Sequence, residues 1–324
     1  MILSRKNFLR VFIAIIFSIG ILYFLLKNID ASIFFSKIPY IDPYRLGNIV
    51  GIYLLHTLSR ALRFSIITRT NIKNVYMISA IHAFLNKILP LRSGELTWPI
   101  LMKKYTNTNF GKSMTLLLLL RYLDLLCVIF LFIVASFIVK PAFVNRPLFI
   151  FLVSVLIIQI ASIIHGQFLI KSFSWGVKKI KLPFLTDRFE KIMNIFSQFQ
   201  QYIYPSQRYW QNMGVLILLT LMSWLTIYAI YYHYIRMFQI EFEFFQVIIG
   251  ASFVSLGNNL PINSFGTFGT FELTWTAGFL LLGMSKDIAI PLGLFINVSN
   301  TLLSCLIAFI GYIILTLSSR SRTS

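Results

Sequence analysis

Residues 82–95 read HAFLNKILPLRSGE and residues 257–272 read GNNLPINSFGTFGTFE. Each interrupts an otherwise apolar stretch, at 75–104 and at 247–284. Each has an asparagine ahead of Leu-Pro, then a patch of Ser or Gly, and then a hydroxyl residue two positions before a glutamate. Proline removes a backbone donor and ends a helix, and glycine lets the chain turn. Both stretches are therefore predicted to be a half-helix, a loop and a second half-helix.

The hinges of these broken segments can be assigned to individual residues. We expect them at Pro90, Gly94, Pro261, Gly266 and Gly269. Ser93 or Thr270 is then expected to cap the second half-helix, with Glu95 or Glu272 in its first turn, where the helix dipole favours an anion. An irregular backbone within a membrane must be buried in protein or line a wet cavity.

The composition places the chain in the membrane class. Of its 324 residues 57% are hydrophobic and 12% are charged, whereas soluble domains carry about 25% charged residues. The net charge of +19 is spread between apolar spans rather than gathered in one patch, so it indicates the positive-inside rule and not nucleic-acid binding. We expect one integral membrane domain over 1–324, in the inner or plasma membrane of a cell.

Six stretches are long and apolar enough to be full transmembrane helices. They are 8–26, 46–68, 113–139, 147–169, 212–237 and 287–317. Basic residues flank the ends that should face the cytoplasm, which places both termini there. The basic segment 171–211 should also be cytoplasmic, and its aromatic stripe predicts an amphipathic helix that lies on the membrane or packs against the bundle.

The predicted fold class is an all-α polytopic membrane protein with an inverted repeat. The halves, about 1–140 and 147–317, each contain two spans, a broken hairpin and one span. Three crossings per half invert the second half, and the two hairpins enter from opposite sides. If the hairpins cross fully, there are eight or more spans. The third span of each half carries polar residues one turn apart, Arg121 with Asp124 and Asn297 with Asn300.

Charged residues inside a membrane are costly and usually functional. Glu95, Asp124 and Glu272 should be buried, with Arg63, Lys87, Arg92 and Arg121 as their expected partners; Arg121 and Asp124 could instead form a structural pair that locks helices. The expected substrate-binding residues are Lys87, Arg92, Glu95, Arg121, Asp124, Asn259, Asn263 and Glu272. The sequence contains no recognisable catalytic triad, metal cluster or phosphate loop, so we expect no cofactor, no metal and no enzyme activity.

These motifs resemble the lysylphosphatidylglycerol synthase transmembrane region family, also called the flippase-like domain family. The residues that carry the resemblance are Leu89-Pro90 through Glu95, Arg121 through Asp124, Leu260-Pro261 through Glu272, and Arg60 with Arg63. The resemblance implies a lipid flippase-type membrane domain, which in larger members precedes a soluble aminoacyl-transferase domain. This sequence ends at Ser324, so it is not expected to make a lysyl-lipid itself. It also departs from the family's usual Gly-Gly pair at Ser264–Thr267, and Trp98 stands where a basic residue is common.

Two functions of different classes follow. In the first, the protein transports a lipid: half-helix N-termini, Arg92 and Lys87 bind the phosphate, while Glu95 and Glu272 bind a cationic group or exchange ion pairs with arginines. The lipid would be an anionic phospholipid, an aminoacylated lipid or a lipid-linked sugar. In the second, the protein is an accessory subunit that presents lipid to a transferase through 171–211. Intramembrane catalysis by Glu95 and Asp124 is a third alternative.

Overall fold

The computed structural model describes residues 42–164, 209–257 and 265–320, together with isolated positions between 19 and 32. The predicted span 8–26 and nearly all of the basic segment 171–211 lie outside the described residues. The described elements are all helical. They are α3 (Pro43–Thr68), α4 (Ile72–Ile88), η2 (Pro90–Leu96), α5 (Thr97–Thr106), α6 (Phe110–Val139), α7 (Arg146–Ile164), α10 (Tyr209–Met237), α11 (Phe244–Gly257), η3 (Phe265–Thr267), α12 (Thr270–Leu280) and α13 (Lys286–Arg320).

Four of the described helices are long and apolar enough to cross a membrane: α6, α7, α10 and α13. They correspond to four of the six predicted spans. The helix α3 has 26 residues, roughly 39 Å at 1.5 Å per residue, but it carries Arg60 and Arg63 and is not among the four. Large apolar side chains are exposed on α7 and α13, including Ile157, Ile158 and Phe309, as lipid-facing surfaces require. The protein is an all-α integral membrane protein, and the count of six full spans stays a prediction.

Short polar residues start three of the helices that surround the first broken segment. The side chain of Asp42 accepts a hydrogen bond from Tyr44 N at the start of α3, and Pro43 occupies the first helical position. Asn71 caps α4 and Asn109 caps α6 in the same way. The helix ends near the first hairpin are thus set by local sequence.

Both broken segments are interrupted where the sequence predicts. The helix α4 ends at Ile88, directly before Leu89-Pro90, and the chain continues through η2 into α5. The helix α11 ends at Gly257, and α12 begins only at Thr270. Gly266 and Gly269 adopt φ values of +63° and +89°, in the left-handed region that favours glycine, and their role as hinges stays a prediction. Residues 258–264, including Pro261, lie outside the described residues.

The predicted caps of the second half-helices are wrong. Thr270 is the first residue of α12, and the N-cap is Gly269, whose φ allows the chain to enter the helix. Glu272 does lie in the first turn. Ser93 and Glu95 both lie within η2, so α5 starts later, after Leu96. The 3₁₀ turn takes up residues that the sequence pattern assigned to the second half-helix.

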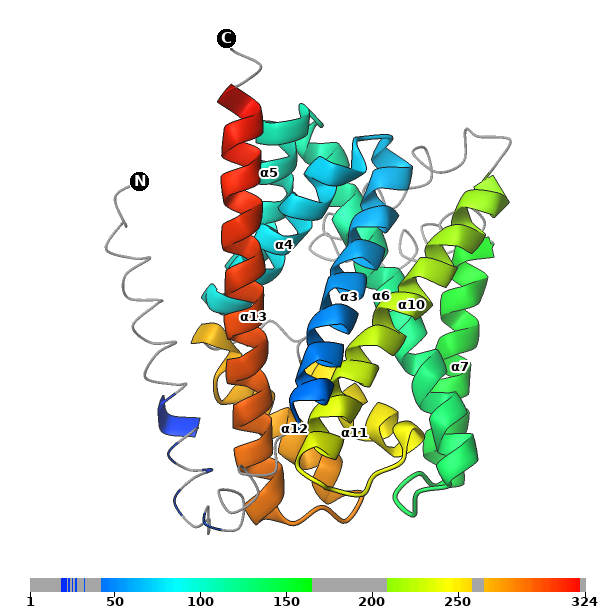
Figure 1. The fold of residues 1–324 in the computed structure, drawn as a ribbon. Coiled ribbons are helices and arrows are strands. Elements are labelled where there is room, and N and C mark those ends of the chain that lie inside the picture. Colours follow the sequence, from blue (N-terminus) through cyan, green and yellow to red (C-terminus); the bar gives the residue numbers. More distant parts are fainter. Residues whose placement is uncertain are drawn as a thin grey trace.

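The two broken segments lie at opposite ends of the bundle (Figure 1). The helices α4 and α5 occupy the end that also holds the last turn of α3, the first turn of α10 and the C-terminal end of α13. The helices α11 and α12 occupy the other end, where α10 ends and α13 begins. Their turns η2 and η3 are in contact. Both hairpins therefore extend from their own end toward the middle of the bundle and meet there.

Each hairpin packs against the last helix of the other half of the chain. The helix α4 packs on α13, and α11 packs on α6, while α3 and α10 pack extensively on each other. Within each half, the hairpin also packs on its own third helix, α5 on α6 and α12 on α13. These reciprocal contacts are the ones that an inverted repeat requires, although the repeat itself stays a prediction.

The buried apolar side chains form two clusters, one at each end of the bundle. One cluster is built on α4, α5 and the first half of α6, with Trp98 and Leu119 fully buried in it. The other is built on α10, α11, α12 and the first half of α13, with Tyr234 and Trp275 fully buried. The stretches of α3, α6, α10 and α13 between the two clusters carry polar side chains, and the site lies there.

Gly94 allows a close approach that holds the first hairpin together. A Cβ at this position would lie 2.3 Å from Asn86 Cα and 2.6 Å from Leu85 O, both backbone atoms that cannot move aside independently. We expect Gly94→Ala to destabilise the protein by about 1–3 kcal/mol through overpacking. The measurement is the thermal unfolding temperature of the purified protein in detergent. Gly51→Ala is the matched control, because a Cβ there meets no atom within 4 Å. Equal unfolding temperatures of the two variants would contradict the prediction.

Candidate functional site

A cavity of about 230 Å³ lies between the two apolar clusters, where both halves of the chain meet. The first half contributes mainly polar and charged side chains from α3, α4 and α6, and the second contributes neutral ones from α10, α11, η3, α12 and α13. The cavity is lined by Tyr53, His56, Arg60, Arg63, Ala83, Asn86, Lys87, Arg121, Asp124, Ser223, Trp224, Ile227, Tyr231, Val254, Ser255, Thr267, Phe271, Asn300 and Ser304.

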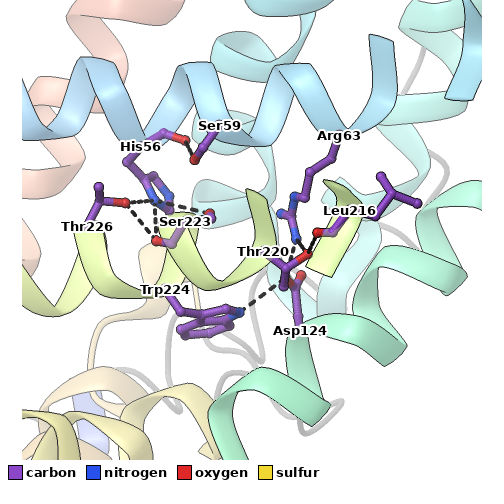
Figure 2. A network of polar contacts seen from close by, with 9 residues as sticks. All are labelled: His56, Ser59, Arg63, Asp124, Leu216, Thr220, Ser223, Trp224 and Thr226. Carbon is purple, nitrogen blue, oxygen red and sulfur yellow. Dashed lines mark hydrogen bonds and ion pairs between the residues drawn. The ribbon is translucent and has the colours of Figure 1, made fainter. Parts of the chain in front are cut away.

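A buried ion pair forms one edge of the cavity (Figure 2). Arg63 Nη1 on α3 lies 2.5 Å from Asp124 Oδ1 on α6, and the Arg63 side chain is 3% exposed. The same Arg63 nitrogen donates to Thr220 Oγ1 on α10 at 3.3 Å, and Trp224 Nε1 donates to Asp124 Oδ1 at 3.1 Å. This network ties three helices from both halves together at the depth of the cavity.

His56 joins the same two helices, α3 and α10, about two turns before Arg63 along α3 (Figure 2). Its Nδ1 lies 2.9 Å from Ser223 O and 3.3 Å from Thr226 Oγ1. The ring therefore has a fixed orientation on the wall of the cavity. Its position on the cavity wall was not predicted from the sequence.

Glu95 at the tip of the first hairpin pairs with the third helix of its own half. Its Oε1 lies 3.4 Å from Arg121 Nη2 on α6, with the two side chains 16% and 29% exposed. Arg121 also lines the cavity. The pair thus links η2 to α6 beside the polar space.

Glu272 at the tip of the second hairpin makes the corresponding link to α13. Its Oε1 accepts from Asn297 Nδ2 at 3.0 Å, and its Oε2 accepts from the backbone N–H of Gly269 at 2.6 Å. Glu272 is completely buried. The carboxylate thus binds one backbone N–H at the start of α12, and phosphate binding by the half-helix N-termini stays a prediction.

Lys87 connects the first hairpin to this second link. Its Nζ donates to Asn297 O on α13 at 3.2 Å and is attracted electrostatically by Glu272. Lys87 also lines the cavity. The two hairpin tips and α13 are therefore linked through Lys87, Asn297 and Glu272.

The two links occupy equivalent places in the two halves. In each, a glutamate near the hairpin tip contacts a polar residue on the third helix, Arg121 in one half and Asn297 in the other. The partners in the second half are neutral where those in the first half are charged. This equivalence agrees with the sequence, in which each glutamate lies at a similar distance along the chain from the polar residues of the third span.

The predicted pair Arg121–Asp124 is replaced by two longer-range pairs. Asp124 pairs with Arg63 of α3, and Arg121 pairs with Glu95 of η2. Each of the two side chains thus finds an opposite charge on another element. Asn259 and Asn263 lie outside the described residues, as does the side chain of Arg92.

Several cavity residues were not predicted as site residues. Among them are Tyr53, His56, Arg60, Trp224 and Tyr231. The signal for Arg60 was its spacing of three from Arg63 within a predicted span, which puts both on one face of the helix. The aromatic residues gave no such signal, because α10 is apolar and aromatic along much of its length. Trp98 is not a cavity residue; it stacks on Phe64 with ring centroids 3.8 Å apart.

The chemistry of the cavity favours an anionic guest. Among the described lining residues are Arg60, Arg63, Lys87 and Arg121, against a single carboxylate, Asp124. Guanidinium and ammonium groups bind phosphate and carboxylate through charge-assisted hydrogen bonds. Cations in the apolar interior of a membrane bundle mark a substrate or ion pathway more often than a purely structural feature.

Comparison with protein-family models gives one match, the lysylphosphatidylglycerol synthase TM region, over residues 11–308. The matched range contains both hairpins and every residue that lines the cavity. Searches of curated proteins and of solved structures gave no match.

Proposed function

This chain belongs to the lysylphosphatidylglycerol synthase TM region family, and we propose that it moves the head group of a phospholipid or glycolipid across the bilayer. The observation that carries the proposal is the cationic cavity between the two hairpin tips. Lipid head groups carry phosphate, and the largest cost of their crossing is the loss of water around that charge. A polar, cationic space halfway through an apolar bundle lowers this cost.

The arrangement of the hairpins supports the same proposal. Transporters commonly place their substrate site near the middle of the membrane, between inverted repeats and beside interrupted helices. We propose that α4–η2–α5 and α11–η3–α12 are re-entrant hairpins of such a repeat. Their reciprocal packing on α13 and α6 would let one hairpin open the cavity to its own side while the other keeps it closed.

The orientation in the membrane belongs to the proposal too. The ends of α3 and α13 and the start of α10 lie at one end of the bundle (Figure 1), and the chain is strongly basic beside those points, at Arg69, Lys73, Arg320 and 171–211. By the positive-inside rule we place this end in the cytoplasm of a cell whose inner or plasma membrane holds the protein.

The experiment is lipid scrambling in proteoliposomes that contain only the purified protein. Head-group-labelled phosphatidylglycerol, its lysyl ester and a glycolipid are quenched from outside, and we expect quenching of at least one label to pass half of the total. The matched variant is Ala83→Trp, which fills the cavity from α4 without removing a charge. We expect it to return quenching to the level of protein-free liposomes.

Two results would contradict the proposal, one by excluding transport and the other by excluding the cavity as its route. One is quenching that stops at half for every lipid with the wild-type protein. The other is an unchanged rate in Ala83→Trp, which would place any scrambling outside the cavity. If no lipid is scrambled but the same lipids bind to the purified protein, the alternative function remains, in which the protein presents lipid without transporting it.

A further inference from the structure

Of the four cations among the described cavity residues, two form an ion pair with a carboxylate and a third is attracted by one. Arg63 pairs with Asp124 at 2.5 Å, and Arg121 pairs with Glu95 at 3.4 Å. Lys87 is attracted by Glu272 across Asn297. A cation that is already paired contributes little net charge to a guest, because its own partner must first be displaced. The paired cations therefore line the cavity but add little net positive charge to it.

Arg60 is different from these three. It lies on α3 between His56 and Arg63, lines the cavity, and has no hydrogen bond or ion pair with any part of the chain that the structure describes. Its charged neighbours include Arg121 and Arg63, which repel it; Asp124 attracts it, but that carboxylate is already bound by Arg63 and Trp224. The undescribed residues 258–264 between α11 and η3 contain no acid. Among the described residues, one positive charge without a carboxylate of its own thus faces the cavity.

The other walls carry neutral acceptors and aromatic rings. Asn86 Oδ1 and Asn300 Oδ1 are buried and have no hydrogen-bond partner among the described residues. An unpartnered buried amide oxygen accepts a hydrogen bond from a hydroxyl group of a guest. Trp224, Tyr231 and Phe271 offer faces on which a glycerol or sugar can pack. These groups would bind a polyol without adding charge.

We propose that the cavity selects a head group with one net negative charge, a phosphodiester that bears neutral hydroxyl groups, and that Arg60 binds its phosphate. The proposal rests on the proposed function and names the substrate class of the same site. A phosphodiester carries a single charge, which Arg60 neutralises, and its hydroxyl groups satisfy Asn86 and Asn300. An aminoacylated head group with a net positive charge would instead bring a second cation beside Arg60 and is expected to be rejected.

The test is direct binding to the full-length protein in a neutral detergent, where no transport takes place. The probe is dihexanoyl phosphatidylglycerol, followed by tryptophan fluorescence, because Trp224 lines the cavity. We expect Arg60→Gln to weaken binding at least about tenfold, or about 1.4 kcal/mol. Arg60→Lys keeps the charge and should recover part of the affinity. Arg45→Gln is the matched control on the same helix, since Arg45 pairs with Asp42 outside the cavity and should leave binding unchanged.

Comparison of head groups completes the test. The lysyl ester of the same lipid should bind at least about tenfold more weakly to the wild-type protein, and Arg60→Gln should narrow this difference. Free glycerophosphoglycerol distinguishes the two sources of a phosphodiester: competition by it shows that the head group alone is the ligand, and no competition shows that the acyl chains contribute. Both results support the proposal.

Three results would overturn it: no binding of the phosphodiester lipid to the wild-type protein, equal affinity in Arg60→Gln, or equal affinity for the lysyl ester. Failure of transport is a separate outcome. Binding that depends on Arg60 in a protein that scrambles no lipid would reject the proposed transport and keep this site. Scrambling by a protein whose lipid binding does not depend on Arg60 would keep the proposed transport and reject the Arg60 site.

Discussion

Replacing Asp124 with alanine is expected to destabilise the folded protein by about 3–5 kcal/mol, the largest effect on stability that the structure predicts for one side chain. The change leaves the buried guanidinium of Arg63 without its carboxylate, and Trp224 Nε1 also loses its acceptor. The nearest remaining partner of Arg63 is the hydroxyl of Thr220 at 3.3 Å, which carries no charge. The measurement is the unfolding temperature in detergent together with the yield of monodisperse protein.

Two further variants test whether the loss of stability in Asp124→Ala comes from breaking the buried ion pair with Arg63. Arg45→Gln breaks the exposed pair with Asp42 and should cost no more than about 1 kcal/mol. The double variant Asp124→Asn with Arg63→Gln removes both charges and should recover much of the stability, because no buried charge is then left alone. If Asp124→Ala unfolds at the same temperature as Arg45→Gln, the pair is not the structural lock that its burial indicates.

Glu272→Gln is expected to reduce lipid scrambling to the level of protein-free liposomes while folded protein is still obtained. Both carboxylate oxygens of Glu272 are acceptors, from Gly269 N and from Asn297 Nδ2, and an amide offers one acceptor and one donor. One of the two bonds must therefore be lost, at a cost of about 1–3 kcal/mol. Lys87 loses its opposite charge at the same time, so the second hairpin tip is released from α13 and from the first hairpin.

The controls exploit the geometry of the link. Adding Asn297→Asp to Glu272→Gln exchanges donor and acceptor, restores both hydrogen bonds and keeps a carboxylate beside Lys87, so scrambling should return in part. Glu243→Gln changes an exposed carboxylate in the turn before α11 and should leave the rate unchanged. Wild-type scrambling in the single Glu272 variant would show that this link takes no part in transport.

The breaks in the two apolar segments could be predicted because proline and glycine act on the backbone locally. Leu89-Pro90 ends α4, and Gly266 and Gly269 turn the chain into α12, whatever packs around them. The caps could not be assigned to the residue. The 3₁₀ turn η2 takes in Ser93 and Glu95, and it is held by the close packing of Gly94 on α4, which is a tertiary contact.

The candidate site was predicted in part. The cavity is lined by three of the predicted residues, Lys87, Arg121 and Asp124. Two more, Glu95 and Glu272, contact Arg121 and Asn297 on the third helix of each half, as charges in apolar segments indicate. Tyr53, Trp224 and Tyr231 were missed because an aromatic residue in an apolar helix has the same pattern whether it faces lipid, core or cavity. Arg60 was noted as part of the family resemblance, and its lack of an ion pair among the described residues distinguishes it as a candidate ligand.

The sequence by itself determined the membrane class, the helical content and the places where two helices break, because hydropathy, proline and glycine act over a few neighbouring residues. Only the tertiary structure decided which charges meet. Arg63 and Asp124 are 61 positions apart, and Lys87 and Asn297 are 210 apart. The first pair depends on how α3 and α6 pack on α10, and the second on how α4 packs against α13 of the other half, so tertiary packing brings together polar groups that are distant in the sequence.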